Sequence, residues 1–495
     1  MHHPLNIIPG LNVIPRLVPT TCTHRIHPFT LRGGIISDSM SLTGNRRHGG
    51  KDGPGGNDGE PGAVWRPPPG KKGALLLARL VEAGQGGIRI RPLGGNRAGE
   101  VGFGRFLRNP RVTSEEIVST ACARTAGLVR GLHVLAAQDT TSSRDDGDQR
   151  SLQLHPMIAI DAMDGAVLGL AHAEFLYRLG GTKSERKNRV FEEKESFRWL
   201  NATRSAAALA EGGAACVTIV ADRECDIYEE FALKPKTVEL LIRAAQDRVL
   251  ADGSHLFTCT DRLPELGRET VALPAAPGRP ARNAVLALRA HRVTIKRPQR
   301  KVPGEAAKLP PRITLTVVDA REIAPPPGAT PAHWRLLTTH QVDTLADAKQ
   351  ITGFYRARWT IEQLFRTMKT KGFDIEAVRV AEGGPFENLT AATLIAAIQV
   401  LQLVRERDGA AGRPLEDVFD PTDQPVIEAI CTSLEGKTAK QKNPHPKGSL
   451  AYAAWVCARL GGWTGYYGKP GPVVTLQGLL RLKAMHQGWS LRRLE

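Results

Sequence analysis

The sequence predicts an α/β fold, with mainly helical segments before and after it, and three features of the chain lead to this prediction. Residues 132–137 and 216–221 are short apolar runs with the length of buried strands, and each ends close to an aspartate. Residues 235–345 contain β-branched runs separated by Pro and Gly, a pattern typical of strands and loops. Apolar residues with helical spacing follow over 345–371 and 388–407. Strands combined with helices in this way indicate an α/β core.

The chain before the first strand divides into two expected parts. Residues 1–72 are rich in Gly, Pro, Arg and His and show no sustained periodicity, so we expect a disordered low-complexity leader. Residues 73–131 are expected to form a helical DNA-binding domain, in which Thr113 and Glu116 have capping-box spacing at the start of a helix. Solvated surface positions are the alternative for its arginines, which include Arg97, Arg105, Arg108 and Arg111.

The remaining chain divides into four expected parts. In the first, Met163-Asp164-Gly165 has the composition of a hairpin turn between two strands, and a helix is expected around 196–210. The four parts are 132–234, the first part of the core; 235–345, a β-rich insertion; 346–407, the second part of the core with a long helix; and 408–495, a helical C-terminal domain.

Composition limits the possible partners and compartments. Of the 495 residues, 41% are hydrophobic and 24% are charged, and the formal net charge of +17 favours binding to a polyanion such as nucleic acid. No unbroken apolar run reaches the roughly 18 residues of a membrane span, and the N-terminus lacks a signal-peptide pattern, so we expect a cytoplasmic protein. The seven cysteines form no CxxC pair, which argues against a zinc ribbon and a disulfide framework.

Three acidic residues are candidates for chemistry. Asp139 and Asp222 each follow an apolar strand, and the ends of neighbouring strands in α/β folds converge on one crevice. The third, Glu362, lies in the predicted long helix with Tyr355, Arg358 and Lys369. On a continuous helix these four residues occupy an arc of about 60°. A salt-bridged helix face is the alternative, because Arg358 and Glu362 are an ordinary i,i+4 pair.

These four residues also match the pattern Y-x2-R-x3-E-x6-K without a gap. In this respect the chain resembles bacterial insertion-sequence transposases with the Tyr-Arg-Glu-Lys (YREK) signature. The resemblance covers roughly residues 74 to 490. It extends to four further segments of this sequence, which are 106–110, 138–141, 193–196 and 222–227.

The resemblance implies an RNase H-like catalytic core that cuts and rejoins DNA. In such a core Asp139, Asp222 and Glu362 would be the catalytic residues and the ligands of two Mg²⁺ or Mn²⁺ ions, which prefer oxygen ligands. Two such ions activate the attacking oxygen and stabilise the leaving oxygen in an in-line displacement. The implied reaction is cleavage at transposon ends followed by strand transfer into target DNA, known as cut-and-paste transposition.

The resemblance also implies DNA contacts and partners. Arg358 and Lys369 would hold phosphates, with Tyr355 as a further backbone contact. Trp334 would stack on a flipped-out end base, and core packing is the alternative. The expected partners are the double-stranded inverted-repeat ends, the target DNA and a second copy of the chain in a synaptic homodimer, associated with the nucleoid in the cytoplasm.

Two departures from the family pattern and two other functions have to be considered. The leader lies outside the pattern, and the stretch 142–155 is shorter and more acidic than usual. One alternative function is a nuclease on the same core. The other is a non-catalytic DNA-end-binding protein, either a decayed transposase or an inhibitor of transposition.

Overall fold

The computed structural model describes residues 97–144, 152–177, 189–275, 280–299, 309–369, 372–378, 380, 382–466 and 468–492. All of them belong to one unit of the chain, Pro61–Glu495. The leader expected at 1–72 and the first part of the expected helical domain, 73–96, lie outside the described residues.

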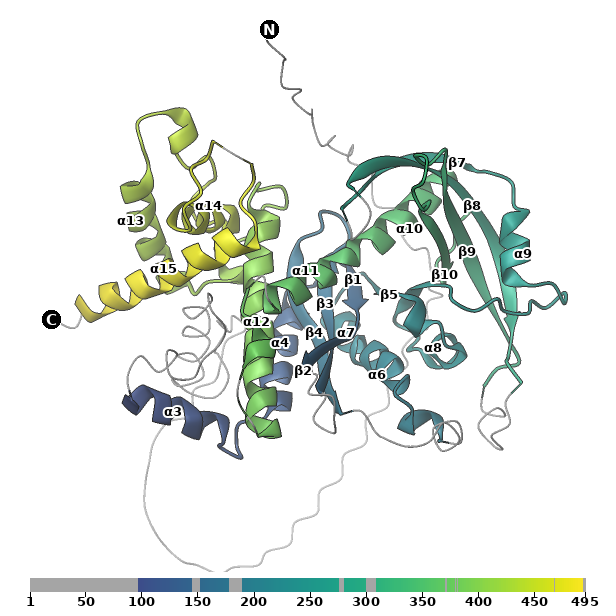
Figure 1. The fold of residues 1–495 in the computed structure, drawn as a ribbon, viewed down its shortest axis with the longest axis horizontal. Helices are drawn as coiled ribbons and strands as arrows, with labels where there is room; N and C mark the ends of the chain where they lie inside the picture. The colour runs from purple at the N-terminus through teal and green to yellow at the C-terminus, as the bar shows by residue number, and fades with distance from the viewer. Residues whose placement is uncertain are drawn as a thin grey trace, which may run out of the picture. The chain divides into compact units, whose positions relative to one another are not determined.

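One mixed sheet connects ten strands of the described part of the chain (Figure 1). Its order is β2-β3-β1-β5-β6-β10-β9-β8-β7, and β4 pairs with β3. The strands are β1 (His133–Gln138), β2 (Thr141–Arg144), β3 (Leu152–Asp161), β4 (Val167–Tyr177), β5 (Cys216–Ala221), β6 (Glu239–Arg243), β7 (Gly267–Leu273), β8 (Arg282–Lys296), β9 (Arg312–Ile323) and β10 (His333–Thr338).

The centre of the sheet combines parallel and antiparallel strands. β1 pairs antiparallel with β3 and parallel with β5, and β5 pairs parallel with β6. β5 covers the apolar run expected at 216–221. Since β6 lies inside the range expected for the insertion, 235–345, the parallel part of the sheet extends further along the chain than the sequence indicated.

The hairpin expected at Met163-Asp164-Gly165 connects β3 and β4, which pair antiparallel. The Asp161 carboxylate accepts a hydrogen bond from the Met163 amide (2.9 Å), and the Asp164 carboxylate accepts one from the Ala166 amide (2.8 Å). Gly165 adopts a φ of 77°, a conformation that glycine reaches without a steric penalty.

The expected β-rich insertion continues the same sheet. β7, β8, β9 and β10 pair antiparallel with one another in turn, and β10 then pairs with β6. Two of the β-branched runs in this part of the sequence, 285–288 and 293–295, belong to the single strand β8. The last strand of this segment, β10, therefore lies beside β6.

Helices cover both faces of the sheet and form two hydrophobic cores. Leu135 and Ala137 of β1 belong to one core, and the alternate residues Val134 and Ala136 belong to the other. The helices are α3 (Arg97–Leu107), α4 (Ser114–Gly127), α6 (Phe197–Ser205), α7 (Ala207–Glu211), α8 (Tyr228–Leu233), α9 (Leu256–Asp261), α10 (Leu345–Ala357), α11 (Trp359–Met368), α12 (Gly383–Glu406), α13 (Gln424–Leu434), α14 (Leu450–Leu460) and α15 (Pro472–Arg492).

The long helix α12 is the centre of the first core. It is the one described helix that is long and apolar enough to cross a membrane, but 94% of its most apolar stretch is buried inside the protein. The sequence did not show it as an unbroken apolar run because polar residues interrupt it. Two of these, Thr390 and Thr393, donate hydrogen bonds to carbonyl oxygens one turn earlier. This degree of burial is typical of a helix in the core of a protein.

The two N-terminal helices pack on α12. The side-chain amide of Asn388 donates hydrogen bonds to the backbone carbonyl oxygens of Leu107 (3.0 Å) and Val112 (2.8 Å). The Thr113 hydroxyl caps α4 by accepting from the Glu116 amide (3.2 Å), as the spacing predicted. The arginines Arg97, Arg105, Arg108 and Arg111 are exposed.

Candidate active site

The first candidate carboxylate lies at an interruption in a strand. β1 and β2 pair with the same neighbour, β3, and Asp139 lies between them. The Asp139 amide continues the pairing through a hydrogen bond to the Pro156 carbonyl oxygen (3.3 Å). Its carboxylate accepts from the Thr140 amide (2.8 Å). Asp139 thus lies where the pairing with β3 passes from β1 to β2.

The second candidate carboxylate follows the neighbouring strand. Asp222 comes directly after β5 and accepts a hydrogen bond from the Glu224 amide (2.9 Å), which caps a short 3₁₀ turn. Because β1 and β5 are adjacent and parallel, Asp139 and Asp222 lie at the same end of the sheet.

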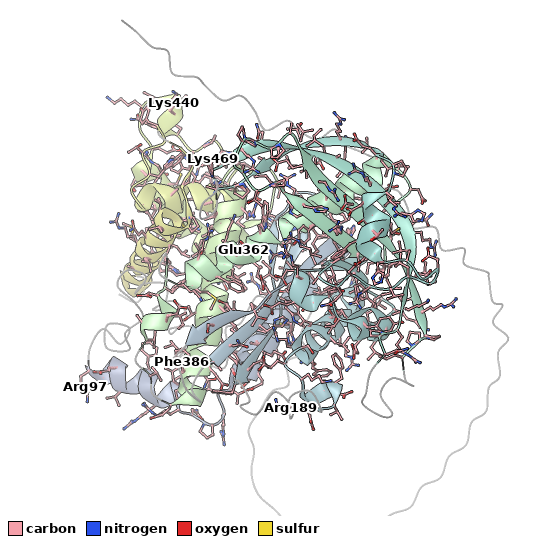
Figure 2. The ribbon with its side chains drawn as sticks, turned by 45° about the vertical axis from the view of Figure 1, so that its right-hand side comes forward. Arg97, Arg189, Glu362, Phe386, Lys440 and Lys469 are labelled. Atoms are coloured by element: carbon pink, nitrogen blue, oxygen red, sulfur yellow. The ribbon has the colours of Figure 1, made fainter. Side chains whose placement is uncertain are left out.

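The helix that carries Glu362 is divided, contrary to the single helix expected over 345–371. α10 ends at Ala357, α11 begins at Trp359, and α11 ends at Met368. Figure 2 shows Glu362 on this helical layer, beside the sheet. Lys369 follows the end of the helix with an extended backbone, so it does not continue the stripe that a straight helix predicts.

Arg358 joins two of the three candidate carboxylates. One terminal nitrogen of its guanidinium lies 2.8 Å from the Asp139 carboxylate, and the other lies 2.8 Å from Glu362. The Arg358 side chain is only 8% exposed. Its Nε is buried and has no hydrogen-bond partner among the described residues. The Arg358–Glu362 pair is therefore part of a site that also includes a residue from the sheet.

The charges at this site influence one another. The pKa of Asp139 is raised to about 6, with burial as the largest cause; the negative charges of Asp222 and Glu362 add to the shift, and Arg358 opposes it. Burial alone would lower the pKa of Arg358, but Tyr355 and the three carboxylates raise it above its ordinary value. Three carboxylates thus share one nearby guanidinium, and the site has an excess of negative charge.

The three carboxylates do not form a tight cluster in this structure. Among the described residues, a single group of three His, Cys, Asp or Glu side chains has all its ligand atoms within 4.8 Å of one another, and it contains none of the three. Arg358 lies between two of them instead. The positive charge of the guanidinium compensates the carboxylates here, as a bound metal ion would.

A buried hydrogen-bond network fixes the chain around Asp139. Burial lowers the pKa of His155 well below its ordinary value, so its ring is neutral. The side-chain oxygen Oε1 of Gln138 accepts from His155 Nε2 (3.1 Å), which leaves Nδ1 to accept from the Thr140 hydroxyl (2.8 Å). Arg198 donates to the same hydroxyl oxygen (2.9 Å) and to the Glu224 carboxylate (2.8 Å). The network therefore connects the segments that follow β1 and β5.

A pocket of about 670 Å³ opens beside Glu362. Glu362 and Arg358 form part of its wall, and Trp334, which is 5% exposed, forms another part. The Trp334 ring packs against Tyr355 (5.8 Å between centroids) and edge-on against Trp359 (6.0 Å). The ring therefore packs in the core and also borders the pocket.

The signature residues have different surroundings in the structure. Tyr355 is 2% exposed and packs in the core beside the pocket. Lys369 forms an ion pair with Glu376 (2.8 Å). Arg358 forms an ion pair with Glu362, and its guanidinium also lies 5.9 Å from the centre of the Tyr355 ring. α11 ends before Lys369, which pairs with Glu376 instead.

Sequence reasoning did not identify several other residues of the pocket wall. Trp359 lies within the signature segment, and Arg223 directly follows Asp222. Their closeness in sequence to candidate residues could have identified them as part of the site. The others come from distant strands and loops and had no such signal. They include Arg243, Phe257 and Arg335.

Residues 181–398 match a protein-family model described as the transposase DDE domain. The matched part includes Asp222 and Glu362, and Asp139 precedes it. Together with the mixed α/β fold, this similarity supports a DDE transposase, a class of DNA-cleaving enzymes. The substrate that this family implies is DNA, and its DDE domains generally use divalent metal ions.

Replacement of Asp139 by asparagine is expected to stabilise the metal-free protein at pH 8. The pKa of Asp139 lies above the ordinary 3.8, so ionisation disfavours the folded state, and this cost grows as the pH rises through about 6. The shift corresponds to at most about 3 kcal/mol. Thermal unfolding in EDTA should show a higher Tm for Asp139→Asn at pH 8 and a smaller difference at pH 5.

Asp408→Asn is the matched control, since Asp408 is an exposed partner of Lys469. It should change the Tm little at either pH. A lower Tm for Asp139→Asn at pH 8 would mean that the ion pair with Arg358 outweighs the cost of burial.

Proposed function

We propose that this chain is a DNA transposase in which Asp139, Asp222 and Glu362 form the catalytic triad. The observation that carries the proposal is the placement of three carboxylates around Arg358, in a chain similar to the transposase DDE domain. Asp139 and Asp222 follow adjacent parallel strands, and Glu362 belongs to α11. The strand arrangement of β4, β3, β1, β5 and β6 supports an RNase H-like core. The signature spacing supports assignment to the YREK subfamily.

The donor set fits a pair of Mg²⁺ or Mn²⁺ ions. Asp139, Asp222 and Glu362 offer only oxygen ligands, which these hard cations prefer. The raised pKa of Asp139 indicates that the site would accept further positive charge. When bound, the ions supply a polarised nucleophile and charge stabilisation at the leaving oxygen.

Arg358 has a different task when DNA is bound. Metal ions at the carboxylates would replace its charge there, and the guanidinium would then be available to a phosphate oxygen. Its buried Nε, which has no partner among the described residues, is a donor for such a contact. In this proposal the arginine holds the carboxylates in the free protein and the DNA backbone in the complex.

The pocket has the composition expected for a nucleotide at a transposon end. Its aromatic side chains offer stacking surfaces for an unpaired base, and Trp334 is the one we assign to that base. The surrounding arginines offer contacts to phosphates, and Tyr355 supports the arrangement by packing against Trp334.

The proposed reaction is cut-and-paste transposition. The enzyme would cleave at double-stranded inverted-repeat ends and transfer the freed strand into target DNA. A homodimer would bring two ends together through the helical C-terminal part, in the cytoplasm and in association with the nucleoid. We assign the exposed arginines of α3 and the following turn to contacts with the end sequence.

Glu362→Ala is expected to abolish cleavage and to leave binding to end DNA nearly unchanged. The substitution removes a metal ligand and spares the basic surface, so cleavage should fall at least about 1000-fold. A cleavage assay with paired inverted-repeat ends and Mg²⁺ measures this, and Glu428→Ala on α13 is the matched control. Persistent cleavage by Glu362→Ala would contradict the assignment.

The same assay distinguishes the three functions considered for the chain. Joined product supports a transposase, whereas nicking without joining supports a nuclease. Binding without any cleavage supports a non-catalytic DNA-end-binding protein.

Lys369→Ala is expected to weaken binding to end DNA and to reduce its salt dependence. Loss of one phosphate contact should lower the slope of log K against log salt by about 1. Filter binding or anisotropy at several salt concentrations measures the slope. Lys469→Ala is the control, because Lys469 is also ion-paired but lies far along the chain in the C-terminal part. Equal slopes for Lys369→Ala and the unmodified chain would refute this role.

A further inference from the structure

A second group of potential metal ligands lies at the opposite end of the central strands. His133 is the first residue of β1, and Cys216 is the first residue of β5. Asp139 and Asp222 follow the other ends of these strands. At about 3.3 Å per residue, six residues of strand separate the two groups by roughly 20 Å. This group is therefore distinct from the proposed catalytic site.

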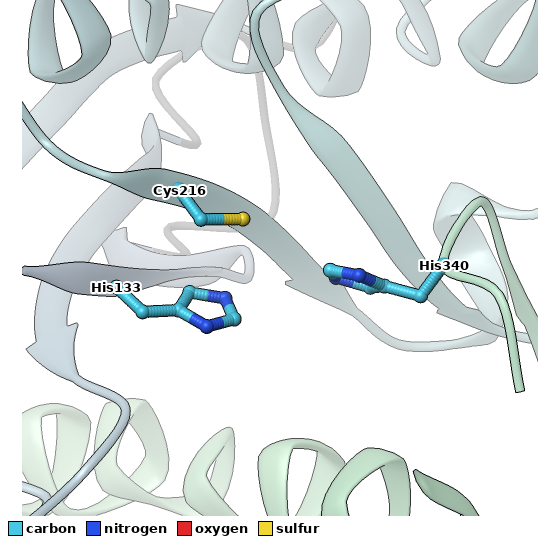
Figure 3. Close-up of side chains that lie close together, drawn as sticks. All are labelled: His133, Cys216 and His340. Atoms are coloured by element: carbon cyan, nitrogen blue, oxygen red, sulfur yellow. The ribbon is translucent and has the colours of Figure 1, made fainter. Parts of the chain in front are cut away.

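Three side chains converge here from different parts of the chain (Figure 3). His133 and Cys216 are paired neighbours on adjacent strands. His340 follows β10 and points toward them. One nitrogen of each imidazole and the Cys216 sulfur all lie within 4.8 Å of one another. All three residues are partly accessible to solvent.

The hydroxyl of Thr218 lies between the two imidazoles. His133 Nε2 and His340 Nε2 are both 2.8 Å from Thr218 Oγ1, and the Cys216 sulfur is 4.0 Å from it. A hydroxyl has a single hydrogen, so it can donate to only one of these nitrogens and must accept from the other. The two Nε2 atoms thus point at one common position.

Both imidazoles are kept in the form that binds metals. Burial is the main cause that lowers the pKa of His133 to about 4, and the neighbouring His340 adds to the shift. Burial also lowers the pKa of His340. Glu239 opposes both shifts, and Lys234 favours that of His340. At neutral pH each ring is therefore neutral and can offer a lone pair.

We propose that His133, Cys216 and His340 form a binding site for a borderline-soft divalent cation of the Zn²⁺ class. Two imidazoles and one thiolate are ligands that Zn²⁺ prefers, whereas Mg²⁺ and Mn²⁺ prefer oxygen. Binding displaces a proton from the Cys216 thiol, and the proton leaves to solvent. This inference does not depend on the proposed function.

The geometry requires only a small adjustment. Zn–N distances of about 2.0–2.1 Å and Zn–S distances of about 2.3 Å place tetrahedral ligand atoms roughly 3.3–3.7 Å apart. Side-chain rotations that move the ligand atoms by about 1 Å bring them from their present separations of up to 4.8 Å into this range. Thr218 loses its hydrogen bonds to the rings, and water completes the fourth position. The nearby Glu239 carboxylate favours the added positive charge.

A metal ion at this site would hold the segment that follows β10 against the central strands. His340 lies in the segment between β10 and α10, and α10 leads to Arg358 and Glu362. The other two ligands belong to central strands. A bound cation would therefore restrain the start of the helical layer against the sheet without contributing to the proposed chemistry.

Cobalt is the probe for this site, because a thiolate ligand gives Co²⁺ a charge-transfer absorption that carboxylates alone do not give. The full chain, reduced and freed of metal, is titrated with Co²⁺. We expect one equivalent to produce this absorption together with tetrahedral visible bands, and Zn²⁺ to remove both. The same titration of Glu362→Ala should be unchanged. Absence of the absorption at stoichiometric Co²⁺ overturns the proposal.

Variants test two of the three ligands. Cys216→Ser should remove the charge-transfer band, and His133→Ala should weaken Co²⁺ binding at least about 100-fold, since even the loss of an outer partner costs 10- to 100-fold. Cys259→Ser on α9 is the matched control and should bind as the unmodified chain does. Equal loss with Cys259→Ser would overturn the assignment.

Thr218→Val separates the metal site from a simple hydrogen-bond cluster. The variant keeps the side-chain shape and removes the hydroxyl that is hydrogen-bonded to both Nε2 atoms. We expect Co²⁺ affinity to be equal or higher. A variant that is folded by circular dichroism but binds no Co²⁺ would show that the three proposed ligands are not sufficient.

Discussion

Charge balance at the end of two parallel strands is the constraint on which the proposed site depends. The parallel pairing of β1 and β5 places Asp139 and Asp222 at one end of the sheet, and α11 adds Glu362. One buried guanidinium, that of Arg358, compensates this group. Burial is the largest cause of the raised pKa of Asp139, and the charges of Asp222 and Glu362 add to it. A site of this kind favours any further cation that fits, which is the physical basis for proposing metal-dependent chemistry.

The sheet supports this site through connections that are far apart in the sequence. The network through Gln138, Thr140 and Arg198 joins the ends of β1 and β5, and β10 returns the chain beside β6 before the helical layer begins. The pocket next to Glu362 combines side chains from these strands with others from α10 and α11. Its aromatic and basic wall is therefore a product of the topology and not of any single sequence segment.

Features with a local signal were predictable from the sequence, and features set by distant contacts were not. The apolar run 216–221 and the hairpin at Gly165 have such signals, and both are present. The break at Arg358 has no proline or glycine to mark it, and one of its ion pairs spans 219 residues. For the same reason the sequence did not reveal the group around Thr218, whose members come from three separate segments. The signature spacing indicated Glu362 as a candidate residue, but the arc predicted for the four signature residues assumed a straight helix.

Anomalous diffraction from Mn²⁺ in crystals of the chain with a double-stranded end tests the central claim most directly. The account predicts Mn²⁺ peaks bounded by oxygens of Asp139, Asp222 and Glu362, with Arg358 released from the carboxylates and turned to a phosphate. Crystals in which the end DNA is bound but Arg358 still bridges Asp139 and Glu362, and no Mn²⁺ lies among the three carboxylates, would contradict it.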